Sequence, residues 1–254
     1  MAEINRYYDI IFVLTQKELR TRYKNLGLGY LWSLANPLAY SAVYYFVFKF
    51  VMKVKVDCFP LFLISALFPW QWFSNSVGVA WITYLGNAPL IKKVNFPRNL
   101  LPFVVSIQDM LHFLASVPII FLFMGIYGKP FSWWLIPGIP ALALIQFAYT
   151  YSIGLAISSV NLFFRDLEKL IGVLMTFLFY LTPIVYSTDM VPEEYRAYTV
   201  LNPVAPLMMS WRLLFFEGRL DAGLIGMSLG YASVFLILSH LIYRKLVWRF
   251  AEVL

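Results

Sequence analysis

Few residues in this sequence are placed to do chemistry. Asp109 and His112 stand three positions apart in an apolar stretch. A helix would put both on one face, where they could relay a proton or bind a metal ion. One carboxylate and one imidazole make a poor ligand set, however. We favour the alternative that they make hydrogen bonds between helices and fix their packing, and we expect no metal site.

The other candidates for catalysis are also weak. The pair Gly128-Lys129 precedes Pro130 and lacks the upstream glycine of a phosphate-binding loop, so we do not expect this chain to hydrolyse ATP. Five acids in the C-terminal third could serve a membrane glycosyltransferase that uses a lipid-linked sugar, but no partner residue completes a catalytic group. They are Asp189, Glu193, Glu194, Glu217 and Asp221. We interpret them first as a solvated rim and assign no catalytic residue.

The elements that must position these residues lie in lipid. Of the 254 residues, 61% are hydrophobic and 13% are charged, and the mean hydropathy is +0.73. A soluble domain carries roughly 25% charge. The net charge of +7 would suggest nucleic acid in a soluble protein. Here the cations form short clusters between apolar runs, which membrane topology explains, so we expect no nucleic-acid partner.

Six segments are apolar over about 20 residues, the length that crosses a bilayer core of roughly 30 Å. They are residues 29–50, 59–82, 100–127, 133–160, 170–188 and 223–243. Since lipid offers no backbone hydrogen bonds, the segments are predicted to be helices. The prediction is an all-α, multi-pass membrane protein with one transmembrane domain over 1–254. An N-terminus inside leaves most of the 20 Lys and Arg residues in the cytoplasm, together with both termini.

Two more segments are predicted to lie at the membrane without crossing it. Residues 5–26 put aromatic and aliphatic residues such as Phe12 on one stripe and cations such as Lys17 opposite. This pattern is typical of an amphipathic helix on the cytoplasmic leaflet, acting as an anchor only or receiving a headgroup or a partner. Residues 190–218 are too apolar for a free loop and too interrupted for a span. We expect two short re-entrant helices there, buried against the bundle before the last span.

Aromatic residues are spaced to line a path. Tyr40, Tyr44 and Phe48 recur at steps of four and would share one helix face, and the fifth span adds Phe177 and Tyr180. Flat rings stack on the C–H face of a sugar, and tyrosine hydroxyls exchange hydrogen bonds with it. The alternative is an aromatic belt at the membrane interface together with lipid-facing packing.

Two cytoplasmic loops carry the remaining candidates. Residues 86–99 hold Lys92, Lys93 and Arg98 among prolines. These cations could meet a lipid pyrophosphate, or they could only enforce topology. Residues 161–169 combine mixed charges with Phe and Leu. That mixture suits a docking site for a soluble partner, or a plain solvated turn.

Several motifs resemble those of a known family. In chain order they are the run Arg-Tyr-Lys-Asn-Leu-Gly-Leu-Gly-Tyr-Leu-Trp at 22–32, Asn36-Pro37-Leu38, Pro89-Leu90-Ile91-Lys92-Lys93-Val94, Phe96-Pro97-Arg98, Arg165-Asp166, Thr182-Pro183-Ile184 and Leu201-Asn202-Pro203. Together they extend almost from end to end and keep their order. The chain resembles the type-2 ABC exporter permeases that move O-antigen, capsule and teichoic-acid polymers, most closely those for O-antigen.

The resemblance implies a permease subunit without its own ATPase site. Such permeases are homodimers with two copies of a separate nucleotide-binding subunit, which binds ATP and Mg, while the permease holds no cofactor. They move undecaprenyl-pyrophosphate-linked polysaccharide across the inner membrane through an aromatic-lined channel, and outer re-entrant helices gate the exit. Positions in this sequence that would line the path are Tyr40, Tyr44, Phe48, Phe177 and Tyr180.

The resemblance also gives roles to the cytoplasmic residues. The loops 86–98 and 161–169 would transmit closure of the ATPase, and the residues expected to couple to it are Leu90, Ile91, Phe164, Arg165, Asp166 and Glu168. The residues expected to attract the lipid pyrophosphate are Arg20, Arg22, Lys24, Lys92, Lys93 and Arg98. Two alternatives stay open: a drug or lipid exporter permease of the same superfamily, and a membrane glycosyltransferase.

Overall fold

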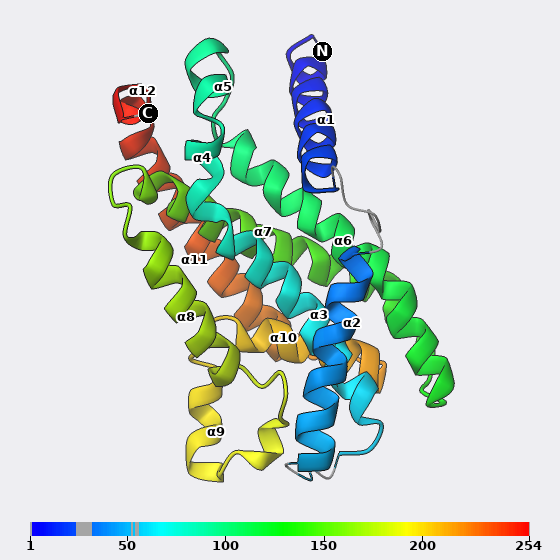
Figure 1. The fold of residues 1–254 in the computed structure, drawn as a ribbon. Coiled ribbons are helices and arrows are strands. Elements are labelled where there is room, and N and C mark those ends of the chain that lie inside the picture. Colours follow the sequence, from blue (N-terminus) through cyan, green and yellow to red (C-terminus); the bar gives the residue numbers. More distant parts are fainter. Residues whose placement is uncertain (1, 24–31, 52, 54–55, 254) are drawn as a thin grey trace.

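The computed structural model describes residues 2–23, 32–51, 53 and 56–253, and every regular element in these ranges is a helix (Figure 1). The longer helices are α1 (Ala2–Tyr23), α2 (Trp32–Tyr45), α3 (Phe59–Gly78), α6 (Leu100–Ile126), α7 (Leu135–Asn161), α8 (Leu167–Leu181) and α11 (Ala222–Leu246). The shorter ones are α4 (Thr83–Gly86), α5 (Ala88–Lys93), α9 (Glu193–Thr199), α10 (Ala205–Arg212) and α12 (Phe250–Val253). The all-α prediction is confirmed.

Within the part of the chain that the structure describes, three helices are long and apolar enough to cross a membrane: α6, α7, and α11 with its continuation to Arg249. α6 and α7 have 27 residues each, or about 40 Å along the axis. The other three expected spans are helical but shorter. α2 continues through a π-helical segment, Phe46–Val51, α3 has 20 residues and α8 has 15.

Prolines account for differences from the predicted boundaries. The span expected at 170–188 is helical only as far as Leu181, since Thr182 is extended with ψ 134°. A residue before proline is driven out of the helical region, and Pro183 follows. The segment expected from 133 begins its helix at Leu135, and Pro137 lies in the first turn of α7, where a missing N–H costs little.

α3 is the centre of the fold. Every residue from 61 to 70 is buried, and α3 packs against α2, α6, α7, α8 and α10. One buried amide joins three of these helices. Gln146 of α7 donates from Nε2 to the Pro69 carbonyl at 2.6 Å and accepts from Trp211 Nε1 of α10 at 2.6 Å. Both ends of the amide are therefore used inside an apolar bundle, where an unpaired polar group would be costly.

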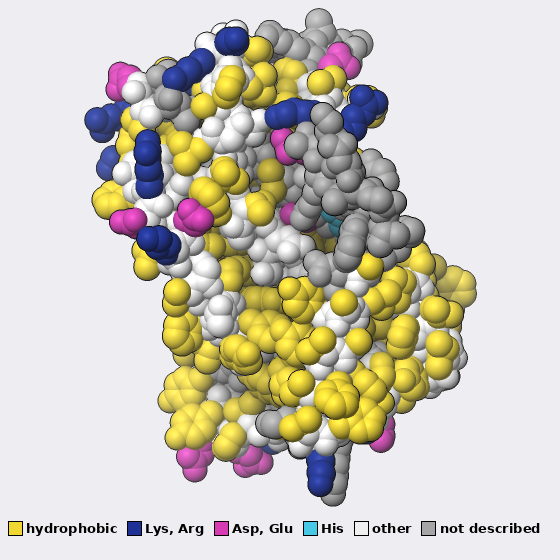
Figure 2. All heavy atoms as spheres, in the orientation of Figure 1, with side chains coloured by type: hydrophobic (Ala, Val, Ile, Leu, Met, Phe, Trp, Pro, Cys, Tyr) yellow, Lys and Arg dark blue, Asp and Glu magenta, His cyan; other side chains and the backbone are white. Residues whose placement is uncertain are grey.

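Positive charge gathers mainly at one end of the molecule. Figure 2 shows Lys and Arg mainly over the end formed by α1, α5 and α12, with hydrophobic side chains over most of the same face below. Exposed cations at this end include Arg20, Lys92, Lys93, Arg244 and Arg249. Figure 1 places α1 and α12 at this same end, so the N- and C-terminal helices share one side of the bundle.

The opposite end contains a turn that requires glycine. After the π-helical segment Leu213–Glu217, Gly218 adopts φ 68°, a left-handed conformation. A Cβ built there would lie 2.9 Å from Ser132 Cβ. Both backbone conformation and space therefore select glycine, and the turn after α10 sits directly against the turn before α7.

Candidate functional site

An aromatic groove opens between α2, α3 and α8. Its volume is about 390 Å³, and it is lined by Tyr40, Tyr44, Leu67, Trp70, Gln71, Ser74, Asn75, Met175, Thr176, Phe179 and Tyr180. Phe179 is the centre of the ring cluster, with centroids 5.4 Å from Tyr44 and 5.7 Å from Trp70. Tyr40 and Tyr180 are 51% and 62% exposed at its mouth. The fold thus brings together three predicted path residues: Tyr40, Tyr44 and Tyr180.

The other two predicted path residues lie beside the groove. Phe48 stands next to Tyr44 on the same helix face, with centroids 6.4 Å apart. Phe177 is 61% exposed on α8. Neither lines the groove itself, so the predicted path residues form a strip of which the groove is the concave part.

The groove lining combines ring faces with neutral polar groups. Gln71, Ser74 and Asn75 come from α3, and Thr176 comes from α8. Sequence analysis missed the α3 residues, although their spacing of three and four in an apolar span places them on one face. The described lining holds no acid, Lys or Arg. Aromatic faces beside amides and hydroxyls suit a neutral, hydroxyl-rich ligand better than an ion.

The two loops at the basic end differ in what they expose. In α5, Ile91 is 5% exposed and packs inward, Leu90 is half-buried, and Lys92 and Lys93 face outward. In the turn between α7 and α8, Phe164 is 71% exposed. The neighbouring Arg165, Asp166 and Glu168 are exposed too. The predicted coupling residues therefore offer both a charged and an apolar surface to a partner.

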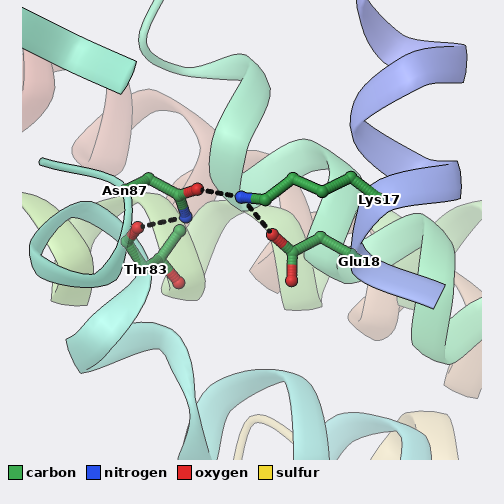
Figure 3. A network of polar contacts seen from close by, with 4 residues as sticks. All are labelled: Lys17, Glu18, Thr83 and Asn87. Atoms are coloured by element: carbon green, nitrogen blue, oxygen red, sulfur yellow. Dashed lines mark hydrogen bonds and ion pairs between the residues drawn. The ribbon is translucent and has the colours of Figure 1, made fainter. Parts of the chain in front are cut away.

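A polar network joins α1 to the first of these loops (Figure 3). Lys17 Nζ donates to Asn87 Oδ1 at 2.6 Å and pairs with Glu18 Oε1 at 3.3 Å. Asn87 Nδ2 donates to the Thr83 carbonyl at 2.9 Å. The amide thus attaches the N-terminal helix to the segment that leads into α5.

The predicted pyrophosphate residues divide into two kinds. Arg20, Lys92 and Lys93 are exposed. Arg98 is half-buried, and its Nη1 donates to the Val247 carbonyl at 2.7 Å. The side chain of Arg22, and Lys24 altogether, lie outside the described residues. Arg98 therefore already has a partner within the chain, whereas the two lysines face outward.

Comparison with known proteins identifies the family of this chain. Residues 10–216 match the ABC-2 type transporter family. The chain belongs to this family. Among its relatives are two proteins of Klebsiella pneumoniae, each called O-antigen export system permease protein RfbA. They are 40% and 42% identical to it over 247 and 248 residues, covering 97% of this chain and 95% of each relative.

More distant relatives carry related names. The O-antigen export system permease protein RfbA of Myxococcus xanthus is 32% identical over 239 residues, covering 93% of this chain and 92% of the relative. The polysialic acid transport protein KpsM of Escherichia coli is 25% identical over 233 residues, covering 88% and 86%. The matches extend over nearly the whole chain, so the groove and both loops lie within the shared region.

In this ABC-2 type transporter, the segment from 182 to 218 is held by buried polar contacts. Arg212 of α10 donates from Nη2 to the Ile184 carbonyl at 2.6 Å, and its guanidinium lies 3.8 Å from the centroid of the Phe62 ring. Tyr149 donates to the Pro203 carbonyl at 2.6 Å. α10 is thereby fixed deep in the bundle, while six of the seven residues of α9 are exposed.

Three of the other acids have local partners. Asp109 is 2% exposed and accepts from Ser76 Oγ at 2.8 Å, a hydrogen bond between α6 and α3 of the kind expected for it. Glu217 pairs with Arg219 at 2.7 Å. Asp221 accepts from the Leu224 amide and caps α11. These acids have structural roles, and the described residues contain no group of three or more metal-binding side chains.

Proposed function

We propose that this chain is the membrane-spanning permease subunit of an ATP-driven exporter that moves O-antigen-type polysaccharide, linked to undecaprenyl pyrophosphate, across the inner membrane. The supporting observation is the match at 40–42% identity to O-antigen export system permease proteins over 97% of the chain. The neutral aromatic groove adds to it, because its chemistry suits sugar rather than ions.

The proposed arrangement has six spans: α2 with its π-helical continuation, α3, α6, α7, α8 and α11. Both termini lie in the cytoplasm, supported by the basic end that α1 and α12 share. α1 lies on the inner leaflet, and α9 and α10 form the re-entrant outer segment. Two copies of the chain would assemble with two copies of a soluble ATPase, which binds ATP and Mg.

The proposed path starts at the basic end. The exposed Arg20, Lys92 and Lys93 attract the pyrophosphate, since juxtamembrane cations interact favourably with phosphate. The glycan then passes the strip of rings that includes the groove. α5 and the turn around Arg165 and Asp166 face the ATPase and receive its closing motion. Arg98 is not assigned to the pyrophosphate, because its guanidinium already donates to the Val247 carbonyl.

Purification with the proposed soluble ATPase subunit tests the proposal. Lipid-linked glycan is expected to stimulate ATP hydrolysis by the complex in proteoliposomes, and the undecaprenyl-pyrophosphate-linked sugar should reach the opposite side. A complex stimulated equally by drug-like molecules and not by glycan would instead indicate a drug exporter. Glycosyl transfer by the chain without ATP would contradict the proposal.

The two exposed lysines sharpen this test. Replacing Lys92 and Lys93 together by Ala removes about 1 kcal/mol of attraction per lysine near an anionic surface. Export of lipid-linked glycan should fall by roughly tenfold or more, while membrane insertion and the amount of protein stay unchanged. The matched control replaces Lys245, another exposed cation near the C-terminal end of α11, and should export normally. Normal export by the double variant would refute the headgroup role.

A further inference from the structure

The C-terminal segment places one buried ring between the two cytoplasmic loops. It follows α11 as a tight turn, Val247–Arg249, and the short helix α12. Phe250 at the start of α12 is 0% exposed. Its ring centroid lies 4.9 Å from that of Tyr84 and 6.5 Å from that of Phe163. Tyr84 leads into the first loop and Phe163 belongs to the second, so one ring touches both.

Cation contacts attach the same segment on two sides. Arg98, at the end of the first loop, donates to the Val247 carbonyl at 2.7 Å, and its guanidinium lies 5.9 Å from the centroid of the Phe250 ring. Arg249 in turn lies 5.9 Å from the centroid of the Phe163 ring in the second loop. The segment is therefore joined to the first loop by a hydrogen bond and to the second by ring contacts.

An apolar cluster surrounds this ring. It collects one residue from α1, three from the stretch 84–96, two from α6, one from the second loop and Phe250 itself. They are Leu14, Tyr84, Ile91, Phe96, Leu101, Val104, Leu162 and Phe250. Close-packed interiors transmit displacement because their side chains have no free space to absorb it. A movement of either loop must therefore displace Phe250.

We propose that Phe250 is a positioning residue that makes the two cytoplasmic loops move as one body. The inference rests on the proposed function, since the motion to be shared is the closure of the ATPase. The loops contact the ATPase at separate places, α5 and the turn at Phe164. The C-terminal segment, held by the hydrogen bond from Arg98 to the Val247 carbonyl, joins the two loops behind that surface. One closing motion of the ATPase therefore reaches both α6 and α8, the helices that follow the two loops.

The test compares ATP hydrolysis with glycan export in the complete complex. Phe250→Ala is expected to leave the ATPase subunit bound and hydrolysing ATP, while glycan exported per ATP falls at least about fivefold, the lower end of typical coupling between sites. Phe250→Leu keeps an apolar side chain and should recover a substantial part of that ratio. Trp248→Ala is the matched control: this ring belongs to the same segment but is 85% exposed, and the ratio should stay at the wild-type value.

Two results would overturn the inference. One is an unchanged export ratio in Phe250→Ala. The other is a parallel loss of hydrolysis and export, which would mean that the ring only holds the complex together. If Phe250→Ala fails to accumulate, Arg98→Met takes its place, because it removes the hydrogen bond to the Val247 carbonyl and leaves the apolar cluster intact; the export ratio should then fall, and an unchanged ratio would count against the inference. Failure of the wild-type complex to couple glycan to ATP would count against the proposed function instead.

Discussion

Two helices that both pack against α3 and α7, namely α8 and α10, are used in opposite ways. α10 has eight residues, of which seven are buried, and its Trp211 is fully enclosed. α8 has 15 residues, of which only Ile171 and Phe179 are buried. Its exposed apolar residues are 53% to 64% accessible in the single chain: Leu170, Val173, Leu174, Phe177, Tyr180 and Leu181. The shorter, proline-bounded helix is thus the more firmly held.

The difference indicates that α10 contributes mainly to the stability of the fold and α8 mainly to transport. α10 is too short to be stable alone, so it depends on Gln146, Arg212 and the rings around Trp211. α8 keeps its apolar face free for lipid, the glycan path or the second copy of the chain. Substitutions in α10 should therefore change folding, and substitutions on the open face of α8 should change transport.

The largest expected effect comes from Trp211→Ala. The ring stacks on Phe215 with centroids 5.5 Å apart and meets Phe113 at 4.9 Å. Removing a buried ring of this size costs about 3–5 kcal/mol. Thermal unfolding in detergent should shift to a clearly lower temperature. Trp133→Ala, which removes an 85% exposed ring, serves as the control. If both variants unfold at the same temperature, the contrast between the two helices is lost.

A smaller loss is expected for Gln146→Leu. The change leaves the Pro69 carbonyl and the Trp211 N–H without their partner, and interhelical hydrogen bonds in membranes contribute about 1–2 kcal/mol at most. Thermal unfolding again gives the measurement. Trp211→Phe removes one of the same hydrogen bonds, so the double variant should lose less than the sum of the two single losses. Strict additivity would show that the two side chains do not interact.

The smallest effect on stability is expected for Tyr180→Ala on α8. Surface substitutions of this kind stay within about 0.5 kcal/mol, so the unfolding temperature should barely change. A ring contact with the glycan of about 0.5–1.5 kcal/mol corresponds to a two- to tenfold loss of export. The matched control is Phe131→Ala, equally exposed at 61% but outside the groove. Destabilisation without loss of export would reverse the roles assigned to α8 and α10.

Local patterns were sufficient for most of the fold. Apolar run length and lipid physics predicted the helices. The aromatic spacing placed Tyr40 and Tyr44 on one face, and the structure puts them in one groove with Tyr180. Each of these signals lies within a few turns of chain.

Long-range pairing could not be predicted from such patterns. Gln146 meets Trp211 across 65 residues, and Arg98 meets Val247 across 149. Nothing in the periodicity of one helix reveals which distant carbonyl or ring lies opposite it. For the same reason the buried position of Phe250 was missed.

The close approach of Gly218 to Ser132 has a genetic consequence. An alanine at 218 would collide with the serine Cβ, 2.9 Å away in the present geometry, and would also be held in a left-handed conformation that costs roughly 1–2 kcal/mol for any residue with a Cβ. A second mutation, Ser132→Gly, can relieve the collision but not the backbone strain. Intragenic suppression between these two positions should therefore be partial.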